Sequence, residues 1–414
     1  MTLIKTSLLS SIATIIKILT GFITVKVISV YLGPSGLALV AQVNNFIGLL
    51  TSLSSGGIGN GIVKYTAEFK ENKVEIFKTW STALKLSVVL SLIIGIFVSI
   101  FSKKISFYLL GNEEFYFVFL IFSLLVIFFT MNTVFTSIFN GLGEIKKLTF
   151  LNVVSSLIGL FIALLLILNF GLKGALISGI VSQFIIFFVI VIFLKKSSLF
   201  SLRIFKEKFD IKTLYNLLNF SGMTLTAVIM NMGALLFLRN YIGNNFGWDS
   251  AGYWQGIWRI SETYLMLITM TLSVYYLPKL SEIQNKKELI KEILYGYKII
   301  IPVVILMAGF IYIFRDFIIR LIFSDDFQPM SDLFLFQLIG DVVKIASWLL
   351  GYIMIAKAMT GKYILLEIIS VLNFVVLSII FLNIYGLVGI TLAFMVNYIF
   401  YFAILALIFK RYFS

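Results

Sequence analysis

Long apolar runs recur along this chain and constrain its fold more than any other feature. Stretches such as Leu86–Phe101 and Phe161–Leu168 show no strict alternation of apolar and polar residues. The 414 residues are 60% hydrophobic and 13% charged, whereas soluble domains carry about 25% charged residues. In lipid, backbone polar groups must be satisfied within helices or a closed barrel. Because barrel strands alternate strictly, the runs predict an all-α membrane protein.

The length of the runs sets the expected number of crossings. With roughly twenty apolar residues per crossing, the chain holds about twelve transmembrane helices. We expect them at 5–31, 37–62, 80–102, 115–140, 148–169, 174–194, 214–240, 250–277, 293–313, 328–357, 362–382 and 387–409. A basic linker at 198–213 separates an N-terminal bundle, 1–197, from a C-terminal bundle, 214–414. Two six-helix bundles around a central cavity are therefore expected.

The basic residues predict the orientation. Most of the 33 fall in the linker and in loops on the same side as the termini. The opposite loops hold Lys103, Lys104, Lys173, Arg315 and Arg320. Positive charge concentrates in cytoplasmic loops, so both termini are expected in the cytoplasm. The net charge of +14 thus reflects topology, and no contiguous basic face indicates nucleic-acid binding.

Several classes of chemistry are excluded by composition. The chain has no cysteine and no histidine, which removes disulfides and thiolate or imidazole metal sites. The run SSGGIGNG from Ser54 lacks the GK[ST] ending of a phosphate loop. It suits close helix packing or a hinge, with backbone contacts to phosphate as the alternative. The external loops are too short for a catalytic domain, so we expect a transporter without a cofactor or metal, not an enzyme.

Two pairs of segments indicate an internal duplication. LNFGLKGALISG from Leu168 matches LNIYGLVGITLAF from Leu382, and YLGPSG from Tyr31 matches GWDSAG from Gly247. An even number of helices per half gives parallel repeats, related by an axis along the membrane normal.

Charges inside the spans are the strongest functional pointers, because one at a helix centre costs about 2.5–3.5 kcal/mol on translocon scales. We expect Lys17 and Lys26, nine residues apart, to lie near one face of the first helix and to line a pathway, with snorkelling as the alternative. Arg239 is a candidate cation too, although interfacial solvation is the simpler account of it. The expected cavity cations are Lys17, Lys26, Arg239, Arg259 and Lys344.

Two pairs of opposite charge lie three residues apart within spans. Arg259 and Glu262 in the eighth span fit a structural pair and a coupled site equally well. For Asp341 and Lys344 in the tenth span, a structural pair is favoured.

Polar and aromatic side chains in the spans leave two further alternatives open. Gln42, Asn44 and Gln255 could bind sugar hydroxyls in a cavity or form interhelical hydrogen bonds. Four aromatic residues are expected in an interfacial belt rather than a sugar-stacking platform: Trp248, Tyr253, Trp254 and Trp258.

Ordered motifs over essentially the whole chain resemble a known family. They are YLGPSGLALVAQ from Tyr31, GNGIVKY from Gly59, GWDSAGYWQGIWRISETYL from Gly247 and RDFIIRLIFSDDF from Arg315 through QLIGDVVKIASWLLGYIMIAKA. Together they resemble the Wzx-type flippases of O-antigen and enterobacterial common antigen lipid III. These flippases belong to the polysaccharide transporter family of the multidrug/oligosaccharidyl-lipid/polysaccharide exporter superfamily.

The resemblance implies alternating access by two six-helix bundles in the cell inner membrane. It implies flipping of an undecaprenyl-pyrophosphate-linked glycan, with the polyprenyl tail in membrane lipid and a polysaccharide polymerase and chain-length regulator as partners. Lys17, Lys26, Arg259 and Glu262 stand where related peptidoglycan-precursor flippases have functional charges. A cation-coupled multidrug or small-solute exporter is the alternative, although the first helix lacks the acid of the drug exporters.

Overall fold

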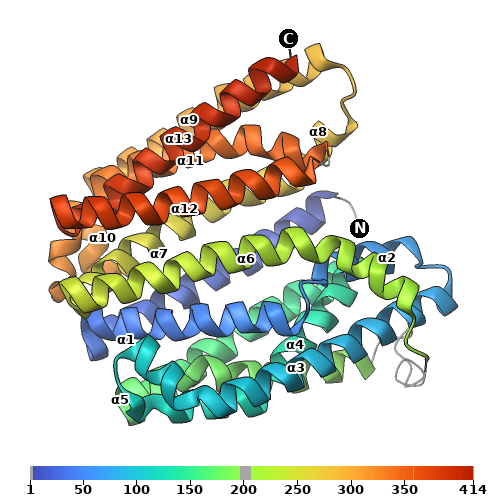
Figure 1. Ribbon diagram of the computed structural model, residues 1–414, viewed down its shortest axis with the longest axis horizontal. Helices are drawn as coiled ribbons and strands as arrows, with labels where there is room; N and C mark the ends of the chain where they lie inside the picture. The colour runs from blue at the N-terminus through green and yellow to red at the C-terminus, as the bar shows by residue number, and fades with distance from the viewer. Residues whose placement is uncertain (1–2, 196–206, 358, 414) are drawn as a thin grey trace. The chain divides into compact units, whose positions relative to one another are not determined.

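The computed structural model describes residues 3–195, 207–357 and 359–413, and these residues form helices and turns without any strand (Figure 1). The expected all-helical architecture is therefore confirmed. The chain forms two compact units. Unit 1 comprises Met1–Leu32 and Leu39–Leu236, and unit 2 comprises Gly33–Ala38 and Phe237–Ser414. Residues 198–206 of the expected basic linker lie outside the described residues.

Unit 1 is built from long helices joined by short turns. They are α1 (Leu3–Ser54), α2 (Gly59–Glu68), α3 (Lys73–Leu110), the 3₁₀ turn η1 (Glu113–Phe115), α4 (Tyr116–Gly141), α5 (Ile145–Lys195) and α6 (Ile211–Phe246), whose last part belongs to unit 2.

Helix α3 exceeds its expected range because specific residues cap both ends. The Asn72 side chain accepts hydrogen bonds from the backbone N–H groups of Val74 and Glu75, which is a favourable N-cap. Gly111, with φ 69°, ends the helix in the left-handed conformation. In the core of this unit, buried Trp80 donates its Nε1–H to Thr66 Oγ1 at 2.8 Å.

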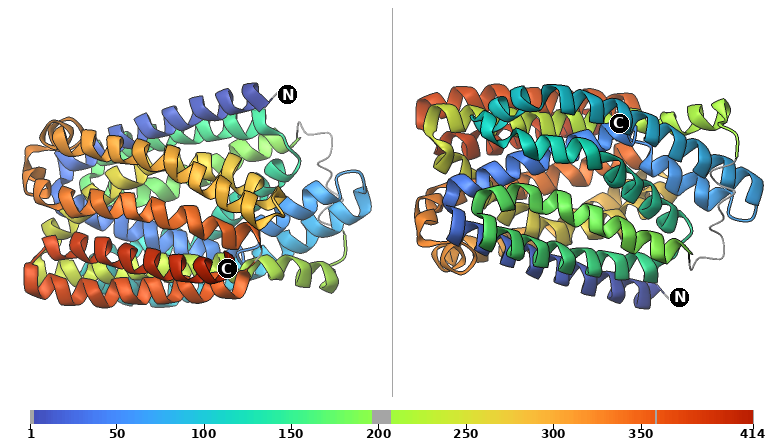
Figure 2. Two further views of the ribbon diagram at one scale, coloured as in Figure 1. Left: turned by 90° about the horizontal axis from the view of Figure 1, so that it is seen from above. Right: turned by 90° about the horizontal axis from the view of Figure 1, so that it is seen from below.

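Unit 2 contains the remaining helices, with α11 in contact with α7, α9, α12 and α13. Figure 2 shows α9, α11, α12 and α13 running side by side. The elements are α7 (Trp248–Thr271), the π-helical turn η3 (Leu272–Tyr276), α8 (Leu277–Glu282), α9 (Lys286–Ile313), α10 (Arg315–Ile322), the 3₁₀ segment η4 (Asp325–Leu333), α11 (Phe334–Ala356), α12 (Thr360–Tyr385) and α13 (Val388–Phe413).

Glycine breaks support the internal duplication. Gly171 interrupts α5 with φ 55° and ψ −132°, and Gly386 separates α12 from α13 with φ 63° and ψ −150°. Three residues later, a Cβ on Gly174 would lie 2.0 Å from Leu166 O, and one on Gly389 would lie 2.1 Å from Phe381 O. Both turns therefore need glycine at two positions. The first glycine has a positive φ, and at the second a side chain would collide with a backbone oxygen of the preceding helix.

The second pair of similar segments meets within unit 2. Gly33 interrupts α1 with φ 67°, and Gly247 precedes α7 with φ 88°. Asp249 Oδ1 accepts a hydrogen bond from Ser35 N at 3.0 Å. The carboxylate thus satisfies a backbone donor at the start of the second segment of α1, where such donors lack partners within the helix.

The glycine run after Ser54 is a tightly packed helix break. Gly56 and Gly57 both have φ 64°, and a Cβ on Gly57 would lie 2.8 Å from Leu225 Cγ on α6. The expectation of close packing in this run is therefore confirmed.

Nine helices of the described residues are long and apolar enough to cross a membrane. Two of these candidates, within α1 and α5, contain the breaks at Gly33 and Gly171. Helix α7 falls outside the nine, because it carries a dense set of polar and charged residues. That helix supplies much of the candidate site.

A buried polar centre in the C-terminal unit

Arg239 lies at the centre of a polar contact between α6 and α7. Its side chain is 1% exposed, and its Nη2 donates to Gln255 Oε1 at 2.6 Å. The guanidinium also lies 5.8 Å from the ring centroid of Trp254, a favourable distance for a cation–π contact. The interfacial explanation of Arg239 is therefore wrong. Gln255 forms an interhelical hydrogen bond, one of its two expected roles.

Asp341 is fully buried on α11 and is held by hydrogen bonds. Tyr264 on α7 donates its hydroxyl to Oδ2 at 2.9 Å, and Gln337, one turn away on α11, donates its Nε2–H to Oδ1 at 3.4 Å. Lys344 forms no ion pair with Asp341 within 4.0 Å in the described part of the chain. The expected direct pair is therefore absent, although the two charges still interact electrostatically.

Lys344 instead projects into an aromatic cage. Its Nζ lies 5.8 Å from the ring centroid of Trp258, 5.0 Å from that of Trp348, and 5.7 Å from those of Phe394 and Tyr398. The rings come from α7, α11 and α13. Each ring face is attractive to a cation within about 6 Å, so the cage stabilises the ammonium and links three helices.

Arg259 and Glu262 on α7 also form no ion pair within 4.0 Å in the structure described. Glu262 is exposed and accepts a hydrogen bond from Trp258 Nε1 at 2.9 Å. It interacts electrostatically with Arg239 and Lys344, while Arg259 is half-buried. A self-neutralising pair is therefore wrong, and the charge of Arg259 is not cancelled by direct contact with this neighbour.

The site candidates of unit 1 differ from these in their surroundings. Lys17 is exposed on α1 and Lys26 is half-buried. Nine residues correspond to two and a half turns at 3.6 residues per turn, so the two lysines leave the helix on opposite sides and do not share a face. Gln42 is buried and donates to Leu236 O on α6 at 3.0 Å, which favours its packing role. Asn44 is exposed.

The aromatic cage is the part of the site that the sequence interpretation missed. Trp254 is buried beside Arg239, and Trp258 contacts Lys344, so both rings contact cations within the protein. The contact between Lys344 and Trp348 could have been predicted from helical spacing, because Trp348 follows Lys344 by four residues and therefore lies on the same helical face. In the described residues, no three Asp or Glu side chains are placed to hold a metal ion.

Sequence comparison finds one matching family and two curated relatives that cover nearly the whole chain. A family model described as "Polysaccharide biosynthesis protein" matches residues 27–332. The lipid III flippase of Escherichia coli (strain K12) is 29% identical over 404 residues, which cover 98% of this chain and 97% of the relative. The lipid III flippase of Shigella flexneri matches with the same identity and coverage.

Solved structures share the fold over nearly the whole chain. An inward-facing multidrug resistance MATE family transporter of the MOP superfamily has a TM-score of 0.81 at 18% identity, covering 96% of this chain and 94% of that one. The lipid II flippase MurJ in an inward closed conformation has a TM-score of 0.76 at 17% identity, covering 98% and 87%. The chain belongs to the family described as "Polysaccharide biosynthesis protein", whose model matches most of its length.

Proposed function

We propose that this protein is a flippase that moves a lipid-linked oligosaccharide from the cytoplasmic to the periplasmic leaflet of the cell inner membrane. The observation that carries the proposal is the similarity to a lipid III flippase over 98% of the chain. The substrate is an undecaprenyl-pyrophosphate-linked repeat unit of enterobacterial common antigen or O-antigen type. A polymerase and a chain-length regulator acting on the same glycan are the expected partners.

The proposed topology has twelve crossings with both termini in the cytoplasm. The nine apolar candidates include two helices, α1 and α5, that each break at a glycine and cross twice. Helix α7 supplies the remaining crossing, and its Gln255 and Tyr264 have hydrogen-bond partners on α6 and α11. Each repeat then holds six crossings, and the basic loops lie on the cytoplasmic side, as the positive-inside rule favours.

The head group requires fixed positive charge along its path. A pyrophosphate carries about two negative charges and is strongly disfavoured in hydrocarbon. Lys17 is exposed and Arg259 lacks an ion pair with Glu262, so these cations are the proposed head-group ligands. Arg239 and Lys344 are occupied by Gln255 and by the aromatic cage, and we assign them to holding the helices of unit 2 in position. Transport proceeds by alternating access of the two bundles.

Depletion of the protein tests the proposal. We expect the lipid-linked repeat unit to accumulate in the cytoplasmic leaflet, as measured by its accessibility to a membrane-impermeant glycan-modifying enzyme in oriented vesicles. Restoration by wild type, but not by Lys17→Gln or Arg259→Gln, supports the assigned ligands, with Lys298→Gln at the start of a span as the matched control. Unchanged sidedness on depletion contradicts the flippase proposal. Altered drug susceptibility with intact surface glycan would indicate a drug exporter instead.

A further inference from the structure

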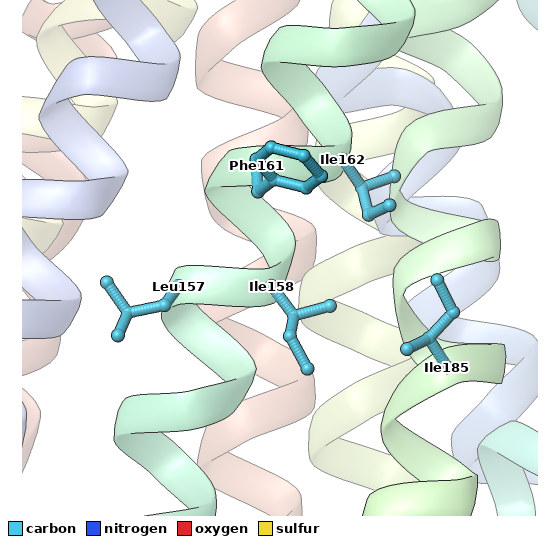
Figure 3. A pocket seen from close by; sticks show the side chains of 5 residues that line it. All are labelled: Leu157, Ile158, Phe161, Ile162 and Ile185. Atoms are coloured by element: carbon cyan, nitrogen blue, oxygen red, sulfur yellow. The ribbon is translucent and has the colours of Figure 1, made fainter.

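An apolar groove lies between the two segments of α5. It has a volume of about 420 Å³ and is lined by Leu157, Ile158, Phe161, Ile162 and Ile185. Figure 3 shows Ile158 and Ile162 facing the segment that carries Ile185, while Leu157 and Phe161 project in a different direction. A buried water needs two to four polar partners, and no lining side chain offers one. The groove therefore suits hydrocarbon.

The groove lies at the middle of the helical segments that form it. Leu157 and Ile158 are midway between Ile145, where α5 begins, and the break at Gly171. At 1.5 Å per residue, Leu157 is about 17 Å along the axis from Lys146, whereas one leaflet of the hydrocarbon core is about 15 Å thick. An ordinary acyl chain anchored beside Lys146 ends near this depth. A hydrocarbon much longer than one leaflet can fill the groove and continue beyond it.

An exposed stripe connects this groove to a cation. The stripe consists of Lys146, Phe150, Leu157, Phe161 and Leu168, which lie within a narrow sector of the helix at 100° per residue. All five side chains are exposed, with Phe161 at 64%.

Lys146 is the cation of the stripe that faces outward. The neighbouring Lys147 instead pairs with Glu144. One end of the stripe is thus positive and the rest apolar, which complements a phosphate attached to a long hydrocarbon.

We propose that this groove holds the polyprenyl chain of the lipid-linked substrate, with Lys146 facing its phosphate at the membrane surface. The inference rests on the proposed function, because only a lipid-linked substrate gives the groove this occupant. It assigns the tail a site on the protein in place of the free lipid phase.

Photocrosslinking tests the groove directly. The full-length protein in nanodiscs is exposed to a C55 polyprenyl phosphate that carries a photoreactive group in its chain, and labelled peptides are mapped by mass spectrometry. We expect labelling within 157–162 and near Ile185, competed by unlabelled C55 polyprenyl phosphate but not by an equal amount of phosphatidylglycerol. Equal competition by phosphatidylglycerol, or equal labelling of the exposed surface around Leu124, overturns the proposal.

Two substitutions sharpen the test. Ile185→Trp fills the groove, and we expect labelling to fall about tenfold, as for a loss of roughly 1.4 kcal/mol of binding free energy. Lys146→Gln removes one partner of the phosphate, and we expect a three- to tenfold loss, or about 0.7–1.4 kcal/mol. Leu124→Trp, at a side chain 77% exposed on α4, is the matched control. Wild-type labelling of Ile185→Trp overturns the proposal, and Ile158→Phe replaces that variant if its thermal unfolding is altered.

The two proposals fail separately. Labelling requires chain binding but not transport. Specific labelling of the groove with unchanged sidedness on depletion contradicts the flippase proposal alone. Normal flipping without specific labelling contradicts the groove alone.

Discussion

Lys344→Met is expected to destabilise unit 2, because it removes the cation that offsets buried Asp341. The two residues are three apart on α11 without an ion pair within 4.0 Å, and Cβ atoms at this spacing lie about 5–6 Å apart, which we take as the scale of the charge separation. At an effective dielectric constant of about 20, their attraction is about 3 kcal/mol. Contacts with four rings add to this loss, while relief of the buried ammonium's desolvation opposes it. Methionine keeps most of the apolar packing, so the charge dominates the change.

The expected loss of about 3 kcal/mol corresponds to a fall in Tm of roughly 6–12 °C for a unit of this size. Thermal unfolding of the purified protein in detergent, followed by intrinsic tryptophan fluorescence, measures it. Asp341→Asn in the Lys344→Met background removes the uncompensated charge and should recover part of the loss. Strictly additive effects of the two substitutions, or a Tm of Lys344→Met within 1 °C of wild type, would refute the electrostatic reasoning.

Three further perturbations test the local structure. Asp249→Ala removes the acceptor of Ser35 N and should destabilise the protein by about 0.5–2 kcal/mol in thermal unfolding, whereas Asp249→Asn should retain most of the stability. Gly386→Ala forces a side chain into a positive-φ turn and should lower stability by roughly 1–2 kcal/mol; an unchanged Tm contradicts the strain. Hydrogen bonds from Thr213 hold the pKa of Asp210 below its usual range, so their stabilisation is present above the ordinary carboxyl pKa and is lost as pH falls through the lowered one. An Asp210→Ala variant whose stability deficit persists unchanged at low pH contradicts this linkage.

Much of the fold could be predicted from the sequence, because apolar length and glycine placement are local properties. Each expected span coincides largely with a helix, and the similar segments around Gly171 and Gly386 adopt the same turn. The hydropathy criterion omits α7 because of its polar and charged residues, two of which, Gln255 and Tyr264, have partners on other helices. Hydropathy is a property of one segment and holds no information about hydrogen-bond partners on other helices.

The candidate site was predicted less well, because partners of a buried charge come from distant segments. Spacing favoured a direct pair for Asp341 and Lys344 on α11, and left a direct pair and a coupled site equally open for Arg259 and Glu262 on α7. In the structure, Glu262 accepts from Trp258, Asp341 accepts from Tyr264, and Lys344 faces four rings. Rotamer choice and tertiary packing decided among these partners. The spacing of residues along the sequence gives no information about rotamers or tertiary packing.

The single-glycine turns at Gly171 and Gly386 leave no slack between the helices they join. The two helices of each hairpin are therefore expected to move as one rigid body, because the turn between them is too short to let one helix slide along the other. Epitope tags inserted at these turns to map topology would disrupt the packing of the two helices. The stretch near Gly111 offers a tolerant place for them, because a short 3₁₀ turn already separates its flanking helices there.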